Sequence, residues 1–196
     1  MRRLATLALV SLLAGQAAAA AAQDFVVGVH AGSTNTRQLS SSGYSAFERG
    51  ASIGLSGAIA MKPWLALQLE LLWADKGLLG RNSGPHRYFE VPYMVKLASP
   101  RPLFGIRPFG LWGAAQAYEL TCVADCASAE RVTTDVSIVS GWGASAELGR
   151  FELAVERRHA RGQNSLTRNA GRITSDVRTL VLRLSIVIPG VVPDWM

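Results

Sequence analysis

The chain has 196 residues, of which 49% are hydrophobic, and a formal net charge of +6. This length predicts one domain, which is long enough to form a sizeable barrel or sandwich. Two of the 20 basic residues, Arg2 and Arg3, lie in a predicted leader, so the remainder carries 18 basic residues against 14 acidic ones. Such a small excess, with scattered basic residues and no interleaved aromatic ones, argues against a nucleic-acid partner.

Residues 1–22 have the composition of a secretory signal peptide. Arg2 and Arg3 provide a positive start, an apolar stretch follows, and Ala20–Ala22 offers a small-residue cleavage site. We therefore predict that the leader is removed after Ala22 and that the protein is exported.

The two cysteines, Cys122 and Cys126, lie close together in a polar stretch. Export implies an oxidising compartment, so we expect them to close a small loop through a disulfide. Two cysteines without a nearby histidine make a metal site improbable, and no cofactor is expected.

Alternation of apolar residues with small or polar ones predicts eight β-strands. The clearest run is WLALQLELLWADKG at 64–77, where Leu65, Leu67, Leu69, Leu71 and Trp73 share one face. The pattern of 106–120 is blurred and leaves the side taken by Trp112 open. In chain order the strands are expected at 24–32, 49–61, 64–77, 87–97, 106–120, 135–148, 151–160 and 176–188.

The connections between these strands alternate between long and short. The short ones lie at Lys62–Pro63, around Pro100–Pro102 and at Gly149, whereas the long loops are expected at 33–48, 76–86, 119–134 and 161–175. This regularity predicts an eight-stranded antiparallel up-and-down transmembrane β-barrel over residues 23–190, followed by a short tail at 191–196. In a bacterial outer-membrane barrel the short connections are periplasmic and the long ones extracellular.

The face opposite the aliphatic one carries charged residues among Ser, Ala and Gly. We interpret it as the lumen of a narrow barrel, in which these charges form a structural ion-pair network. The predicted members of this network are Glu70, Glu90, Lys96, Glu152, Glu156, Arg158 and Arg183.

A soluble, lipocalin-like ligand carrier is the alternative, and it would bury the aliphatic face instead. Two features favour the membrane barrel: small residues would cover an outer surface poorly, and aromatic residues bracket the aliphatic face, as at membrane interfaces. These predicted girdle residues are Phe25, Trp64, Trp73, Phe89, Phe109 and Phe151.

Three runs also resemble a known family. ELLWADKG at 70–77, YFEVP at 88–92 and RPFGLWG at 107–113 are similar to motifs of the PorT-like outer-membrane β-barrel domain family. The resemblance extends from about Val27 to Ile188 and implies a β-barrel in the outer membrane, in which a proline at position 92 is tolerated. It implies no particular ligand.

The sequence contains no evident set of catalytic residues, so we expect that this protein is not an enzyme. The best triad that can be assembled is His159 with Ser165 and Glu156, but Glu156 and His159 would face opposite sides of one strand. A lipid-acting barrel enzyme remains the alternative. The expected protein is a monomeric outer-membrane barrel with a structural or surface-interaction role, in contact with membrane lipids and open to an extracellular partner through its loops.

Overall fold

The computed structural model describes residues 24–40, 43–44, 48–76, 86–121, 134–163 and 174–190. Every regular element in these ranges is a β-strand. The described residues therefore contain no helix that is long and apolar enough to cross a membrane. The strands are β1 (Asp24–Ser40), β2 (Gly43–Tyr44), β3 (Glu48–Lys62), β4 (Leu65–Lys76), β5 (His86–Ala98), β6 (Ile106–Thr121), β7 (Thr134–Leu148), β8 (Phe151–Gly162) and β9 (Thr174–Ile188).

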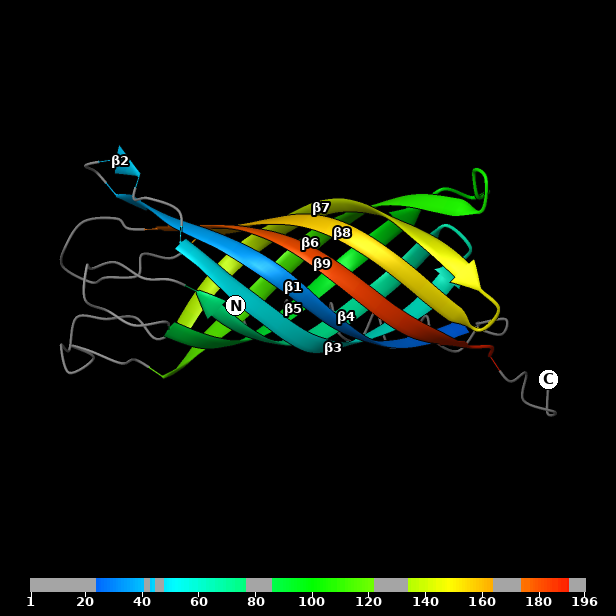
Figure 1. The fold of residues 1–196 in the computed structure, drawn as a ribbon, viewed down its shortest axis with the longest axis horizontal. Helices are drawn as coiled ribbons and strands as arrows, with labels where there is room; N and C mark the ends of the chain where they lie inside the picture. The colour runs from blue at the N-terminus through cyan, green and yellow to red at the C-terminus, as the bar shows by residue number, and fades with distance from the viewer. Residues whose placement is uncertain are drawn as a thin grey trace, which may run out of the picture.

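The strands form one closed antiparallel barrel (Figure 1). Strand β1 pairs with β3, each strand from β3 to β8 pairs with the next, and the seam between β1 and β9 runs from Phe25 opposite Ile188 to Leu39 opposite Thr174. Strand β2 only extends the far end of β1 through two residue pairs. The wall therefore has eight strands, which confirms the predicted eight-stranded antiparallel barrel.

Side chains alternate strictly between the two sides of the wall. In β4, Leu69 is 52% exposed on the outside, whereas its neighbours Gln68 and Glu70 are 3% and 1% exposed. All eight wall strands place large exposed hydrophobic residues on the outside, including Trp112 and Trp142. A water-soluble carrier would hide these side chains inside, so the apolar outer wall excludes that alternative and fits a lipid-facing surface.

One predicted girdle residue, Phe109, was assigned to the wrong side. Its side chain is buried in the lumen, and the Lys96 ammonium lies 4.4 Å from the centre of its ring. The reason is its partner on β7, Gly143, which has no side chain and leaves the space that the ring fills. Trp112, whose side the sequence left open, points outward.

The first strand is longer than the sequence indicated. Residues 33–40 were predicted to belong to a polar loop, yet β1 continues to Ser40 and remains paired with β9 as far as Leu39. The Thr34 hydroxyl also donates a 3.0 Å hydrogen bond to the Asp75 carbonyl. A strand beyond the bilayer can be polar on both faces, so the apolar alternation fades although the ladder continues.

Pro92 lies inside β5 and not at an edge. The ladder between β4 and β5 pairs Leu69 with Tyr93 and Leu72 with Glu90, but it omits the two pairs between them. On the other side, Pro92 still pairs with Ala115 of β6. A local gap in one ladder therefore accommodates the missing N–H donor.

A charge introduced on the outer wall tests this orientation. We expect Leu69→Arg, in the middle of the apolar wall, to lower the free energy of unfolding in lipid vesicles by about 2–4 kcal/mol. Leu120→Arg, at an exposed position next to the end of β6, is the matched control and should cost no more than about 1 kcal/mol. Denaturant unfolding followed by tryptophan fluorescence measures both, and equal losses would contradict a lipid-facing position for Leu69.

Candidate functional site

The barrel interior contains a compact group of charged side chains, which we call the lumen cluster. It comes from two regions of the wall, the adjacent strands β4 and β5 and the adjacent strands β8 and β9. Because inward positions alternate, every second residue of β8 adds a charged or small side chain to it. The lumen cluster consists of Glu70, Lys96, Glu152, Glu156, Arg158 and Arg183, each no more than 8% exposed.

Arg158 joins two carboxylates in the middle of the lumen. Its Nη1 and Nη2 donate to Glu70 Oε2 and Oε1 at 2.5 and 2.7 Å, which is a bidentate pair. Its Nε also donates to Glu156 Oε2 at 2.8 Å. One guanidinium thus connects β4 with β8 across the interior.

Arg183 and Lys96 extend the cluster toward the short connections. Arg183 Nη2 lies 2.8 Å from Glu156 Oε1 and 3.4 Å from Glu152 Oε1. Lys96 Nζ donates to the same Glu152 oxygen at 3.0 Å. The chain of contacts therefore runs without interruption from Glu70 to Lys96.

The lumen cluster contains three carboxylates and three cations, so its formal charge is zero. Removing one partner from such a buried group leaves an uncompensated charge, which is far more costly than losing an exposed pair. The cluster therefore joins β4, β5, β8 and β9 through contacts that depend on one another.

Two residues that lie next to the lumen cluster were not predicted from the sequence to belong to it. Gln68 Nε2 donates to Glu70 Oε1 at 2.5 Å, and the buried His30 places Nε2 at 3.9 Å from Glu70 Oε2. His30 fits because its β3 partner is Gly54, whose missing side chain leaves room for the ring. Both residues occupy inward positions of their strands, so the alternation contained the signal for them.

Glu90 and the two cysteines are the remaining predicted site residues. Glu90 is half-buried on the inward face of β5, farther than Lys96 from the short connections. Cys122 and Cys126 lie outside the described residues, as does the signal peptide, so both predictions remain predictions. Among the described residues, no group of His, Cys, Asp and Glu is arranged to hold a metal ion.

A cavity of about 480 Å³ lies at the end of the barrel that carries the short connections. Lys62 and Pro63 of one turn and Gly149 of another contribute to its rim, and it extends inward to Lys96 and Arg183. Its lining mixes carboxylates and cations, so it favours neither anions nor cations. The lumen cluster forms its inner boundary.

A cluster of apolar side chains also packs inside the barrel. They come from β5 to β8, and each is no more than 5% exposed. This apolar cluster lies among buried polar side chains of the same strands, such as Ser137 and Ser145 of β7. Its members are Met94, Phe109, Leu111, Ala115, Val139 and Ala154.

The outer wall also carries polar side chains near the long connections. His159 Nε2 lies 2.9 Å from Asp176 Oδ1, and Arg37 donates to Asp176 Oδ2 from Nη2 at 2.7 Å. Ser140 of β7 is the ladder partner of His159. The triad assembled from the sequence does not form: Glu156 points inward and His159 outward, and the third member lies outside the described residues.

These features define a class of protein. A closed eight-stranded up-and-down barrel with an apolar outer wall and a filled, charged interior is a small β-barrel of the outer-membrane type. The chain is similar to Neisserial surface protein A, with a TM-score of 0.57 and 11% identity over 81% of this chain and 96% of that one. It is also similar to the outer membrane protein OprG from Pseudomonas aeruginosa, with a TM-score of 0.56 and 10% identity over 86% and 97%.

At such low sequence identities, the similarity to these two structures shows a shared fold and nothing more. Comparison with family models and with curated protein sequences finds no match. The PorT-like resemblance therefore rests on its three sequence runs alone.

Removing a residue of the lumen cluster tests how much the cluster contributes to the stability of the barrel. We expect Arg158→Met to lower the free energy of unfolding by about 3–5 kcal/mol, because Glu70 and Glu156 would keep buried charges without their main partner. Arg107→Met removes a more exposed pair, in which Arg107 Nη1 lies 3.0 Å from Glu147 Oε1, and should cost less than about 1 kcal/mol. Urea titration of both variants in vesicles measures the losses, and a small loss for Arg158→Met would contradict the assignment.

Proposed function

We propose that this protein is a small, monomeric barrel of the bacterial outer membrane with a structural or surface-interaction role and no open pore. The observation that carries the proposal is the interior: a charge-balanced lumen cluster and packed apolar side chains occupy the space through which a solute would pass. The outer wall favours contact with lipid over its whole circumference. A surface partner would approach from the long connections.

Three measurements on the full chain test this proposal. The unboiled protein should migrate differently from the boiled protein on a detergent gel, since a closed barrel resists unfolding by detergent, and cell fractionation should recover it with the outer membrane. In planar bilayers it should produce no stable conductance steps. Steady channels from the wild-type protein would refute the closed-lumen assignment.

Opening the lumen provides the matched comparison. We expect the double variant Glu70→Ala, Arg158→Ala to conduct ions where the wild type does not, because it removes both members of the central bidentate pair and leaves no net charge imbalance. Glu147→Ala, which changes an exposed carboxylate at the barrel end, is the control and should remain closed. Bilayer recordings on folded, heat-modifiable samples decide the comparison, and silence from the double variant would show that other side chains close the lumen.

A lipid-acting enzyme is the second candidate function. The observation that favours it is the outward group in which His159 contacts Asp176 and neighbours Ser140 along the ladder, since serine, histidine and aspartate on adjacent strands are the residue types of acyl transfer. Release of fatty acid from lipid by the wild-type protein, lost in Ser140→Ala and in His159→Ala, would support this candidate. No release from the wild-type protein would reject it.

A further inference from the structure

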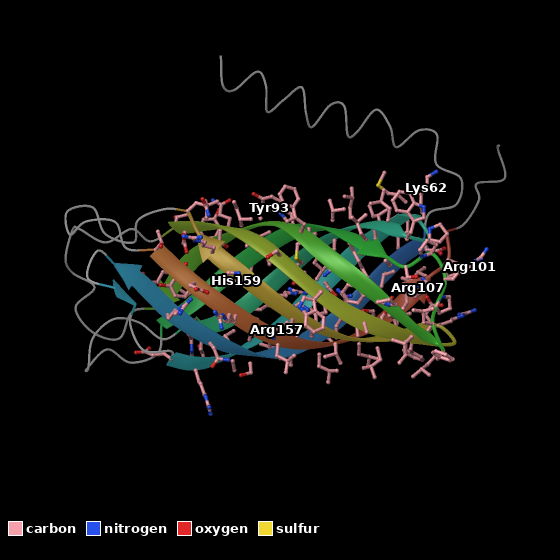
Figure 2. All side chains as sticks on the ribbon, turned by 90° about the horizontal axis from the view of Figure 1, so that it is seen from above. Lys62, Tyr93, Arg101, Arg107, Arg157 and His159 are labelled. Carbon is pink, nitrogen blue, oxygen red and sulfur yellow. The ribbon has the colours of Figure 1, made fainter. Side chains whose placement is uncertain are left out.

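A charged residue, Arg157, interrupts the apolar outer wall. The three outward residues that precede it on β8 are apolar, and Arg157 itself is exposed. Its ladder partners are Trp142 on β7 and Leu180 on β9, which are 65% and 58% exposed. Figure 2 shows Arg157 between the two ends of the barrel, whereas Lys62, Arg101 and Arg107 lie at the end with the short connections.

On the described outer wall, the carboxylate nearest to Arg157 along the strands already has other partners. Among the described residues, the Arg157 side chain makes no ion pair, and the nearest outward acid along the neighbouring strand is Asp176. Asp176 already accepts hydrogen bonds from Arg37 and contacts His159. An anion that neutralises Arg157 must therefore come from outside this part of the chain.

More basic residues follow toward the long connections. Arg161 and His159 share the outward face of β8, Arg178 is the ladder partner of His159, and Arg37 is the partner of Asp176 on β1. We call these residues the outer basic patch. It comprises Arg37, Arg157, His159, Arg161 and Arg178, with Asp176 as its one acidic neighbour on the described outward faces of β8, β9 and β1.

An arginine inside a lipid-facing wall is costly unless its charged head reaches a polar partner. Arg157 precedes Arg161 by four residues, which corresponds to about 10 Å of height in a tilted strand. An extended arginine side chain spans much of this distance and can direct its guanidinium toward the headgroups. At the level of the headgroups, a lipid phosphate can serve as this polar partner.

We infer that the outer basic patch binds the phosphate groups of an anionic lipid in the membrane leaflet nearest the long connections. An anionic lipid satisfies both parts of this surface, because its acyl chains pack against Trp142 and Leu180 while its phosphates accept hydrogen bonds from the arginines. The inference rests on the proposed placement in the outer membrane. It adds a lipid class and a site to that proposal.

Native mass spectrometry of the full chain in detergent, with lipid A as the probe, tests the site. We expect Arg157→Gln to weaken lipid A binding by about tenfold, since it removes charge-assisted hydrogen bonds, and Arg157→Lys to weaken it less, because the charge remains while the planar fork is lost. Arg101→Gln, an exposed arginine in the turn between β5 and β6, is the matched control and should bind like the wild type.

Competition and folding controls separate the possible outcomes. Phosphatidylcholine and inorganic phosphate should not displace lipid A, and displacement by inorganic phosphate alone would show a simple anion site and overturn the lipid assignment. Equal binding by Arg157→Gln and the wild type would also overturn it, as would a change in oligomeric state in place of lipid loss, which would identify a protein interface. Heat-modifiable migration of each variant reports the barrel itself, so a failed lipid site and a failed barrel are distinguishable.

Discussion

The hydrogen-bonded seam between β1 and β9 is the constraint on which the rest of the structure depends. Inside a bilayer no water satisfies backbone N–H and C=O groups, so a spanning sheet must close and leave no edge. The seam pairs residues along β1 from Phe25 to Leu39, and it fixes the circumference of the barrel at eight strands. A barrel this narrow can contain side chains but leaves little space for anything else.

Closure of the barrel also determines which kinds of side chain each face of the wall can carry. Outward residues meet hydrocarbon and are apolar, and inward residues have to fill a fixed volume without leaving charges unpaired. The lumen cluster meets this requirement with three carboxylates and three cations, while Gly54 and Gly143 leave room for the rings of His30 and Phe109. Charge balance and packing inside the barrel are therefore achieved by individual residue pairs, whose members lie on strands that can be distant in the sequence.

The same principle makes the outer basic patch conspicuous. The charges of the lumen cluster have partners of opposite sign, but Arg157 lies among apolar side chains on the wall that faces lipid. Lipid is the medium that this wall contacts, so the lipid itself is the reasonable source of the missing anion. The lumen cluster is neutralised by side chains of the protein, whereas the inferred counterion of the outer basic patch is a membrane phosphate.

The sequence by itself determined the strand number, the alternation of long and short connections and which residues of β4, β8 and β9 face inward, because a period of two is written directly into each strand. Only the tertiary structure decided which charges meet: Arg158 joins Glu70, 88 residues away, through the ladder register and barrel closure. It also placed Phe109 inward, since the vacancy that receives the ring belongs to Gly143 on another strand. Contacts across a barrel depend on shear and closure, which no local pattern encodes.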